Sequence, residues 1–223
     1  MKKLFYILCC SLAVLFTACE GEEPSDPNGH EWVDLGLPSG IKWATCNVGA
    51  ISPEGYGDYF AWGETTTKST YNWNTYKWCN GSSSTQTKYC TSSSYGTVDN
   101  KTVLDLSDDA ARANWGGSWR MPTIAEQDEL LNTSYTTWTW TTQNGVNGYK
   151  VTSKINGNSI FLPAAGCRYF SDLEYVGYAG LYWSSSLDTD GSRYAYVLNF
   201  VSGDVDLGGS SRNCGLSVRP VLP

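Results

Sequence analysis

A period of two dominates the beginning of the chain. The odd-numbered positions of Val33–Leu37 are apolar and alternate with polar or small residues, a Pro-Ser-Gly turn occupies 38–40, and Ile41 and Trp43 resume the period. Alternation at this spacing puts one side of each strand against a core. The pattern therefore predicts a β-hairpin at the start of the folded domain, which we expect to begin at Trp32.

Two short helical segments are predicted in the middle of the chain. Ser107 is suited to cap the first helix, because Asp108 and Asp109 then place negative charge in its first turn, where the helix dipole favours it. Gly116 and Gly117 end this helix, since glycine adopts the positive φ of helix ends without strain.

The second helix begins with a capping box, Thr123 followed three residues later by Glu126, and the segment Ile124–Leu131 has an apolar side. Trp115 and Trp119 lie between the two helices. We predict that both rings fill the core, and that the arginine after Trp119 binds neighbouring carboxylates or carbonyls.

Further segments alternate like strands. Thr136–Gln143 alternates aromatic residues with threonine, and Tyr149–Ile155 alternates apolar with polar residues up to Asn156-Gly157, a pair typical of a type I′ hairpin turn before Ser159–Leu162. Later candidate strand segments occupy 181–186, 193–201 and 215–220. Many short antiparallel strands with two central helices indicate an α+β fold.

Periodicity disappears between Glu64 and Asn100. This segment is rich in Ser, Thr, Asn and aromatic residues, a composition used by sugar-binding and antibody-like surfaces. The alternative is that its rings fold back and cover the core. The sequence leaves both interpretations open for the aromatic residues Tyr71, Trp73, Tyr76, Trp78, Tyr89 and Tyr95.

Residues 1–18 have the form of a secretory signal peptide. Two lysines precede an apolar run that is too short to span a bilayer, and Phe-Thr-Ala-Cys19 resembles a bacterial lipobox. The resemblance implies cleavage before Cys19 and its lipidation; the alternative is an ordinary secreted protein with a free cysteine. We expect a lipidated, flexible segment over 19–31 and a single domain over 32–223.

Charge narrows the choice of partners. Without the signal peptide the chain has 22 acidic and 13 basic residues, so it carries nine net negative charges. Nucleic acid is therefore not an expected partner, because phosphate binding needs a basic surface. Acidic residues directly after Cys19 also resemble the surface-export signal of some outer-membrane lipoproteins. The expected location is the outer membrane, held by the lipid anchor and exposed at the cell surface.

Five cysteines remain after processing at Cys19. We expect one disulfide between Cys79 and Cys90, which close a short Ser/Thr-rich loop, and a second between Cys167 and Cys214, with Cys46 as a buried thiol. This is one of fifteen ways of choosing two bridges from five cysteines.

Several strings resemble the Fibrobacter succinogenes major paralogous domain. They are VDLGLPSGIKWATCNVG at 33–49, YGDYFAWGE at 56–64 and DDAARANWGGSWRMPT at 108–123, followed by FLPAAG, YWSSS and GLSVRP. The resemblance implies a C-type lectin-like fold, in which two helices flank small antiparallel sheets and the termini lie close together. It also implies a secreted or lipidated bacterial surface protein, and leaves the activity undefined.

In this fold, ligands meet the face built from the later loops and strands, which corresponds here to 183–213. Aromatic, acidic and cationic groups occur together there, as suits a polar ligand. The alternative location is the segment 64–100. The residues predicted to contact a ligand are Trp183, Asp188, Asp190, Arg193, Tyr194, Asp204, Asp206 and Arg212.

The sequence gives little support for a metal site, a cofactor or a catalytic nucleophile. Asp188-Thr-Asp190-Gly191 supplies only two carboxylates, whereas calcium needs six or more oxygens. His30 is the only histidine and lies in the expected flexible segment, and no CxxC pair is present, so no transition metal, cofactor or catalytic triad is expected.

The resulting expectation is a non-catalytic surface lipoprotein that binds glycan or protein ligands. One alternative is a glycoside-active enzyme that uses paired carboxylates such as Asp204 and Asp206. Another is a structural subunit or receptor of a surface assembly, with 183–213 diversified as in lectin-fold targets of retroelements.

Overall fold

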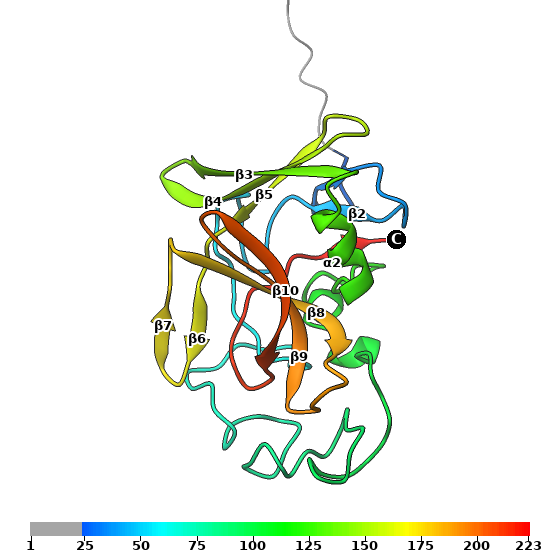
Figure 1. Cartoon of the computed structure of the whole chain (residues 1–223), viewed down its shortest axis with the longest axis vertical. Helices are drawn as coiled ribbons and strands as arrows, with labels where there is room; N and C mark the ends of the chain where they lie inside the picture. Colours follow the sequence, from blue (N-terminus) through cyan, green and yellow to red (C-terminus); the bar gives the residue numbers. More distant parts are fainter. Residues whose placement is uncertain (1–23) are drawn as a thin grey trace, which may run out of the picture.

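The structure, a computed structural model, describes residues 24–223 and consists of short strands around two α-helices (Figure 1). The strands are β1 (Trp32–Asp34), β2 (Lys42–Ala44), β3 (Thr136–Gln143), β4 (Val146–Ser153), β5 (Ser159–Pro163), β6 (Cys167–Tyr169), β7 (Asp172–Glu174), β8 (Ala179–Leu187), β9 (Tyr194–Val201), β10 (Asp204–Ser211) and β11 (Val221–Leu222). The helices are the 3₁₀ turn η1 (Leu106–Asp108), α1 (Ala110–Trp115) and α2 (Ile124–Leu131). Antiparallel sheets with two helices agree with the expected α+β class.

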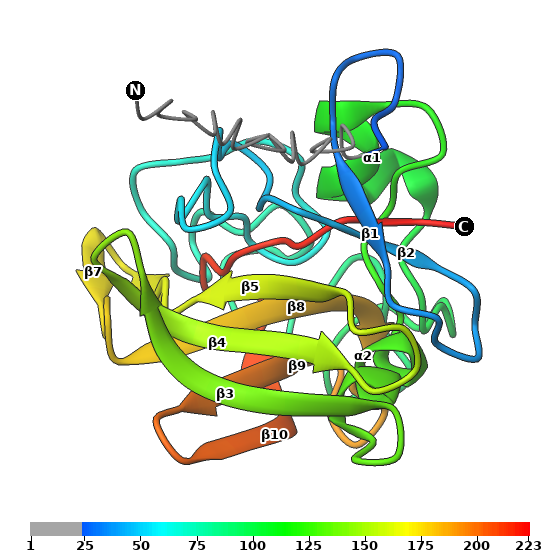
Figure 2. The ribbon, with the colours of Figure 1, turned by 90° about the horizontal axis from the view of Figure 1, so that it is seen from above.

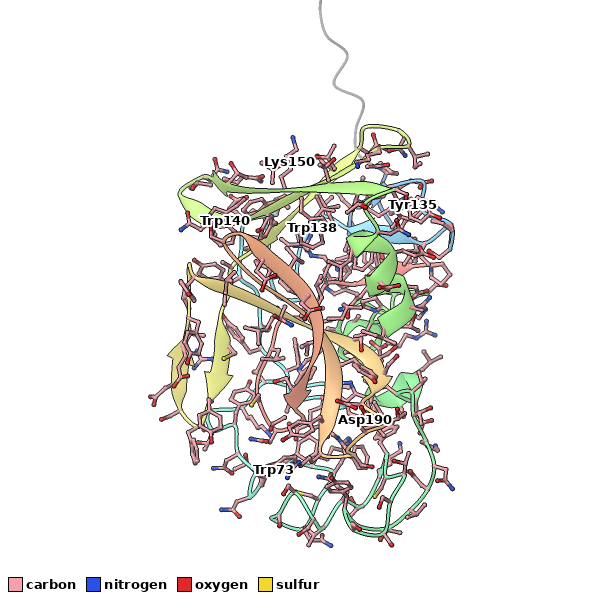
Figure 3. All side chains as sticks on the ribbon, in the orientation of Figure 1. Trp73, Tyr135, Trp138, Trp140, Lys150 and Asp190 are labelled. Carbon is pink, nitrogen blue, oxygen red and sulfur yellow. The ribbon has the colours of Figure 1, made fainter. Side chains whose placement is uncertain are left out.

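The described strands form four small antiparallel sheets, with the orders β1-β2-β11, β10-β9-β8, β3-β4-β5 and β6-β7. Figure 2 shows β3, β4 and β5 lying across β8, β9 and β10. Aromatic rings fill the space between these two sheets. The ring of Tyr149 packs edge to face against those of Trp138 and Phe200, with ring centres 5.4 and 5.3 Å apart. In Figure 3, Trp138 and Trp140 lie on this inner side of β3. Such edge-to-face pairs stabilise beyond the area they bury.

The hairpin predicted at the start of the domain is present. β1 pairs with β2 in the register Val33↔Trp43, and the apolar residues of the alternation are buried. β11 pairs with the other edge of β2, at Val221↔Trp43. Strands from both ends of the described chain therefore share one sheet.

The second helix begins as predicted, and the first does not. Thr123 and Glu126 form a full capping box. Helix α1, however, is capped by Asp109, whose carboxylate accepts from the backbone N–H of Arg112 at 3.0 Å and of Met121 at 2.8 Å. Ser107 lies within η1 instead. Asp109 therefore serves both α1 and the segment that follows it, and its burial raises its pKa.

The tryptophans between the helices belong to the core, as predicted. Trp119 is fully buried and packs edge to face against Trp115, with ring centres 4.9 Å apart. Arg120 forms an ion pair with Glu126, with Nη1 2.7 Å from Oε2 and Nη2 2.5 Å from Oε1. This pair ties the segment between the helices to the first turn of α2.

The type I′ turn was predicted at the wrong Asn-Gly pair. Asn144 and Gly145 both have positive φ and connect β3 to β4 by two residues, as a type I′ turn requires. The loop around Asn156 and Gly157 is longer, and only Gly157 has positive φ there. Asn156 instead donates to the carbonyl oxygen of Asp34 at 2.9 Å, which fixes this loop to β1.

The segment between Glu64 and Asn100 contains no helix and no strand of the named sheets, and most of its aromatic rings face inward. Tyr71, Tyr76 and Tyr89 are buried, and Trp78 donates to the carbonyl oxygen of Gly63 at 2.7 Å. Trp73 lies in this segment at the lower end of the molecule in Figure 3. The structure thus favours the second interpretation, in which the rings cover the core.

Neither predicted disulfide is present, because every cysteine of the described chain is a free thiol. Cys79 Sγ donates to the carbonyl oxygen of Trp73, and Cys90 Sγ to that of Ser92, each at 3.1 Å. Backbone carbonyls therefore satisfy the two thiols that a short loop was expected to join.

Cys19 and the predicted signal peptide lie outside the described residues. Within 24–223, no helix combines the length and apolar character needed to cross a membrane. The end of the expected flexible segment packs against the domain. Asp26 accepts from Trp119 Nε1 at 2.8 Å, and the His30 ring stacks on Trp115 with ring centres 4.0 Å apart. The folded unit therefore begins before Trp32.

Candidate binding surface

Two of the predicted ligand contacts are core residues, which corrects the sequence-based assignment. Trp183 is fully buried and donates through Nε1 to the carbonyl oxygen of Phe60 at 2.7 Å. Arg212 is also fully buried. Its guanidinium donates to Tyr76 Oη and to the carbonyl oxygens of Lys88, Tyr89 and Ser192, at 2.7 to 3.0 Å. Neither side chain can meet a ligand at the surface.

The other predicted contacts divide between the two ends of the β8–β9–β10 sheet. Asp188, Asp190, Arg193 and Tyr194 surround the β8–β9 loop, and Asp190 marks this end in Figure 3. The guanidinium of Arg193 lies over the ring of Tyr194 at 4.8 Å and over that of Tyr95 at 5.9 Å. Because Tyr95 belongs to the segment 64–100, this end of the sheet adjoins the alternative location considered for a ligand.

Asp204 and Asp206 lie at the opposite end of that sheet. They face solvent on β10, where Asp204 pairs with Val201 and Asp206 with Asn199. The length of β9 separates them from the β8–β9 loop. The predicted residues therefore do not form a single site.

A different surface stands out, on the β6–β7 hairpin and the turn that follows it. Six large apolar side chains within ten residues are each 40 to 63% exposed. The hairpin lies at the left edge of the molecule in Figure 1, on the side away from α2. A concentration of exposed apolar side chains on one element marks an interaction surface. We call this set the aromatic hairpin; it comprises Tyr169, Phe170, Leu173, Tyr175, Val176 and Tyr178.

The aromatic hairpin is fixed to the core by backbone hydrogen bonds at its turn and in the middle of β6. Phe170 and Tyr71 exchange two, at 2.8 and 3.0 Å, and Arg168 and Gly215 exchange two more, at 2.8 and 2.9 Å. The guanidinium of Arg168 also lies 5.4 Å from the centre of the buried Tyr59 ring. These contacts hold the exposed rings in place before any ligand arrives, which lowers the entropic cost of binding.

Titratable groups in and around the hairpin are held in their neutral forms by partial or full burial. Burial raises the pKa of Tyr59 to about 12 and that of Cys214 to about 11, and it also raises the pKa of Cys167. A thiol with a raised pKa is a poor nucleophile at neutral pH. The hairpin therefore offers rings and hydroxyl groups, with the carboxylates of Asp172 and Glu174 beside them, rather than a reactive group.

Within residues 24–223, no three His, Cys, Asp or Glu side chains lie close enough together to bind a metal ion. The arrangement at the aromatic hairpin is suited to contact with a partner molecule through flat, amphipathic rings.

The sequence analysis did not identify this hairpin, although one signal was available. Tyr169 and Phe170 are adjacent aromatic residues directly before Ser171-Asp172, a pair of turn-forming residues. Rings beside a turn lie at the surface unless another segment covers them. Here they meet edge to face at 4.7 Å and each remains about half exposed.

Comparisons with protein-family models, with curated proteins and with solved structures find no match to this chain.

Proposed function

We propose that this protein is a non-catalytic binding module of a bacterial surface lipoprotein, and that it holds neutral glycans on the aromatic hairpin. The observation that carries the proposal is the set of half-exposed rings on a hairpin whose turn and strand β6 are hydrogen-bonded to the core. Rigid, exposed rings contribute contact area at little entropic cost.

The chemistry of the hairpin favours a sugar. The C–H groups of a pyranose ring carry partial positive charge and stack on the negative face of an aromatic ring. Tyrosine hydroxyls and the carboxylates of Asp172 and Glu174 can accept hydrogen bonds from sugar hydroxyls. The net negative charge of the chain disfavours anionic polymers, so the glycan expected here is a neutral one.

The family resemblance supports a C-type lectin-like fold for this module. β1 and β11 flank β2, two short α-helices lie between the first hairpin and the later strands, and β8, β9 and β10 form a separate antiparallel sheet. Pairing of strands from the two ends of the described chain supports this part of the proposal, because the resemblance implies termini that lie close together.

Attachment through Cys19 is the part of the proposal that the sequence supports. Expressed in a Gram-negative host, the wild-type chain is expected in the outer-membrane fraction with the mass of an acylated Cys19. Cys19→Ser is expected to lose the acyl mass and the membrane fractionation together, because lipid chains dominate the membrane affinity. Wild-type protein without acyl mass would contradict the anchor and leave the binding proposal standing.

Glycan binding is tested on the chain from Glu20 to Pro223, applied to an array of neutral and anionic glycans and of proteins. Replacing Tyr169, Tyr175 and Tyr178 together by Ala is expected to remove glycan binding, whereas replacing all three by Phe retains most of it, since the rings remain. Ile51→Ala is the matched control, because Ile51 is a fully exposed apolar residue outside the hairpin. Binding of protein targets alone, or glycan binding that survives the Ala variant, would contradict the proposal.

A further inference from the structure

A second site lies away from the aromatic hairpin, in a cavity of about 280 Å³ between the beginning of β1 and the outer face of β4 and β5. Its lining combines the charged residues Glu31 and Lys150, the polar residues Gln143 and Ser159, and an apolar floor that includes Val33 and Phe161. Lys150 lies on the outer side of the β3–β4–β5 sheet, opposite Trp138 and Trp140 (Figure 3). Polar and apolar residues contribute about equally to the lining, which suits a small ligand with both charged and apolar parts.

One buried guanidinium holds two walls of this cavity together. Arg219 is fully buried and donates to the carbonyl oxygen of Thr45 at 2.8 Å on one wall and to that of Phe161 at 2.9 Å on the other. Thr45 in turn donates through its backbone N–H to the carbonyl oxygen of Glu31 at 3.1 Å. The position of Glu31 relative to β5 is therefore set by the core.

A second contact fixes the rim. The carboxylate of Glu54 accepts from Asn144 Nδ2 at 2.9 Å and from Gln143 Nε2 at 3.4 Å, which ties the loop at Pro53 to the β3–β4 turn. The cavity is thus framed by contacts that do not depend on a ligand, and a preformed site binds with less ordering cost.

The two charged side chains of the lining, Glu31 and Lys150, are exposed, and neither takes part in an ion pair of residues 24–223. Lys150 offers three N–H donors and a positive charge, and Glu31 offers two acceptor oxygens and a negative charge. A ligand that carries both a carboxylate and an ammonium group satisfies both.

We infer that this cavity binds a small zwitterion with an apolar body, of the amino acid or dipeptide type, with its carboxylate toward Lys150 and its ammonium toward Glu31. The apolar body lies against Val33, Pro53 and Phe161. The cavity is just below the range of about 300 to 1,000 Å³ common for ligand pockets, which limits the ligand to this size. The inference does not rest on the proposed glycan binding.

The test uses isothermal titration of the chain from Glu20 to Pro223 with leucine, leucine amide, N-acetyl-leucine and glucose. Leucine is expected to bind, and blocking either of its charges is expected to weaken binding by about tenfold or more. Lys150→Gln is expected to abolish the preference for leucine over leucine amide, and Glu31→Gln the preference for leucine over N-acetyl-leucine. Lys42→Gln, outside the cavity, is the matched control and keeps both preferences.

Three results would overturn the inference: no heat with leucine at millimolar concentrations, equal binding of the blocked compounds, or preferences that persist in Lys150→Gln and Glu31→Gln. Amide NMR spectra of each variant report whether it is folded, so a variant that fails to fold is replaced by Lys150→Met or Glu31→Ala. Loss of the aromatic hairpin rings is expected to leave leucine binding unchanged, which separates the two sites.

Discussion

Replacing Arg212 by methionine tests the role that the structure gives to this side chain. Methionine fills much of the same volume but cannot donate a hydrogen bond. The variant leaves Tyr76 Oη and the carbonyl oxygens of Lys88, Tyr89 and Ser192 without their donor, and it also removes the guanidinium that lies 5.0 Å from the Trp62 ring centre.

The expected cost follows from these contacts. Each buried acceptor left without a partner costs about 1 to 3 kcal/mol, and relief of guanidinium burial offsets part of the sum. The partners of Arg212 are neutral, so the variant leaves no unpaired charge behind and the loss comes from the four acceptors. We therefore expect Arg212→Met to lower the free energy of unfolding by about 3 to 5 kcal/mol, and to increase amide exchange around Lys88 and Tyr89.

Arg193→Met is the matched comparison, because Arg193 is exposed and its guanidinium lies over the rings of Tyr95 and Tyr194. Its expected cost is below about 1 kcal/mol. Both variants are measured by urea unfolding with tryptophan fluorescence, at neutral pH. Equal, small losses in the two variants would refute the assignment of Arg212 as the internal tie between β10 and the segment 64–100.

Two further predictions concern a turn and a carboxylate. Gly166→Ala is expected to destabilise the protein by about 3 kcal/mol or more, because Gly166 has positive φ and an added Cβ overlaps the carbonyl oxygen of Glu174. Gly145 also has positive φ, but its surroundings leave room for a Cβ, so Gly145→Ala should lower the free energy of unfolding by only about 1 kcal/mol. Both variants are compared by thermal unfolding, and equal decreases in their melting temperatures would contradict the prediction. Burial opposes ionisation of Asp26, yet hydrogen bonds, above all from His30, lower its pKa from 3.8 to about 2. The stabilising effect of the ionised Asp26 is therefore present above about pH 4 and is lost as the pH falls toward about 2. The midpoint of urea unfolding should change less with pH over this window in Asp26→Asn than in the wild type. The same pH dependence in both proteins would refute this prediction.

Local signals predicted the parts of the fold that depend on local contacts. The capping box at Thr123 involves atoms three residues apart, and the first hairpin follows from alternation within a dozen residues. The choice between Asn144-Gly145 and Asn156-Gly157 is different, because both pairs carry the same turn signal. It is decided by the bond from Asn156 to Asp34, 122 residues away in sequence.

The site was harder to predict, for a similar reason. Trp183 and Arg212 have the chemistry of ligand contacts, and only the packing of distant segments shows that they are buried. The rings of the segment 64–100 turn inward because their partners, such as Asp108 for Tyr89, come from elsewhere in the chain. Exposure of the aromatic hairpin likewise depends on how the rest of the described chain packs, which no short motif encodes.

The position of Asp204 and Asp206 affects how two copies of this chain can associate. β10 is the outer strand of its sheet within the described chain, so its free edge presents backbone groups that another strand could join. Both carboxylates are exposed along that edge, and a second copy of this acidic chain is repelled as it approaches. Edge-to-edge pairing of two copies through β10 would bring these like charges together, which disfavours such pairing.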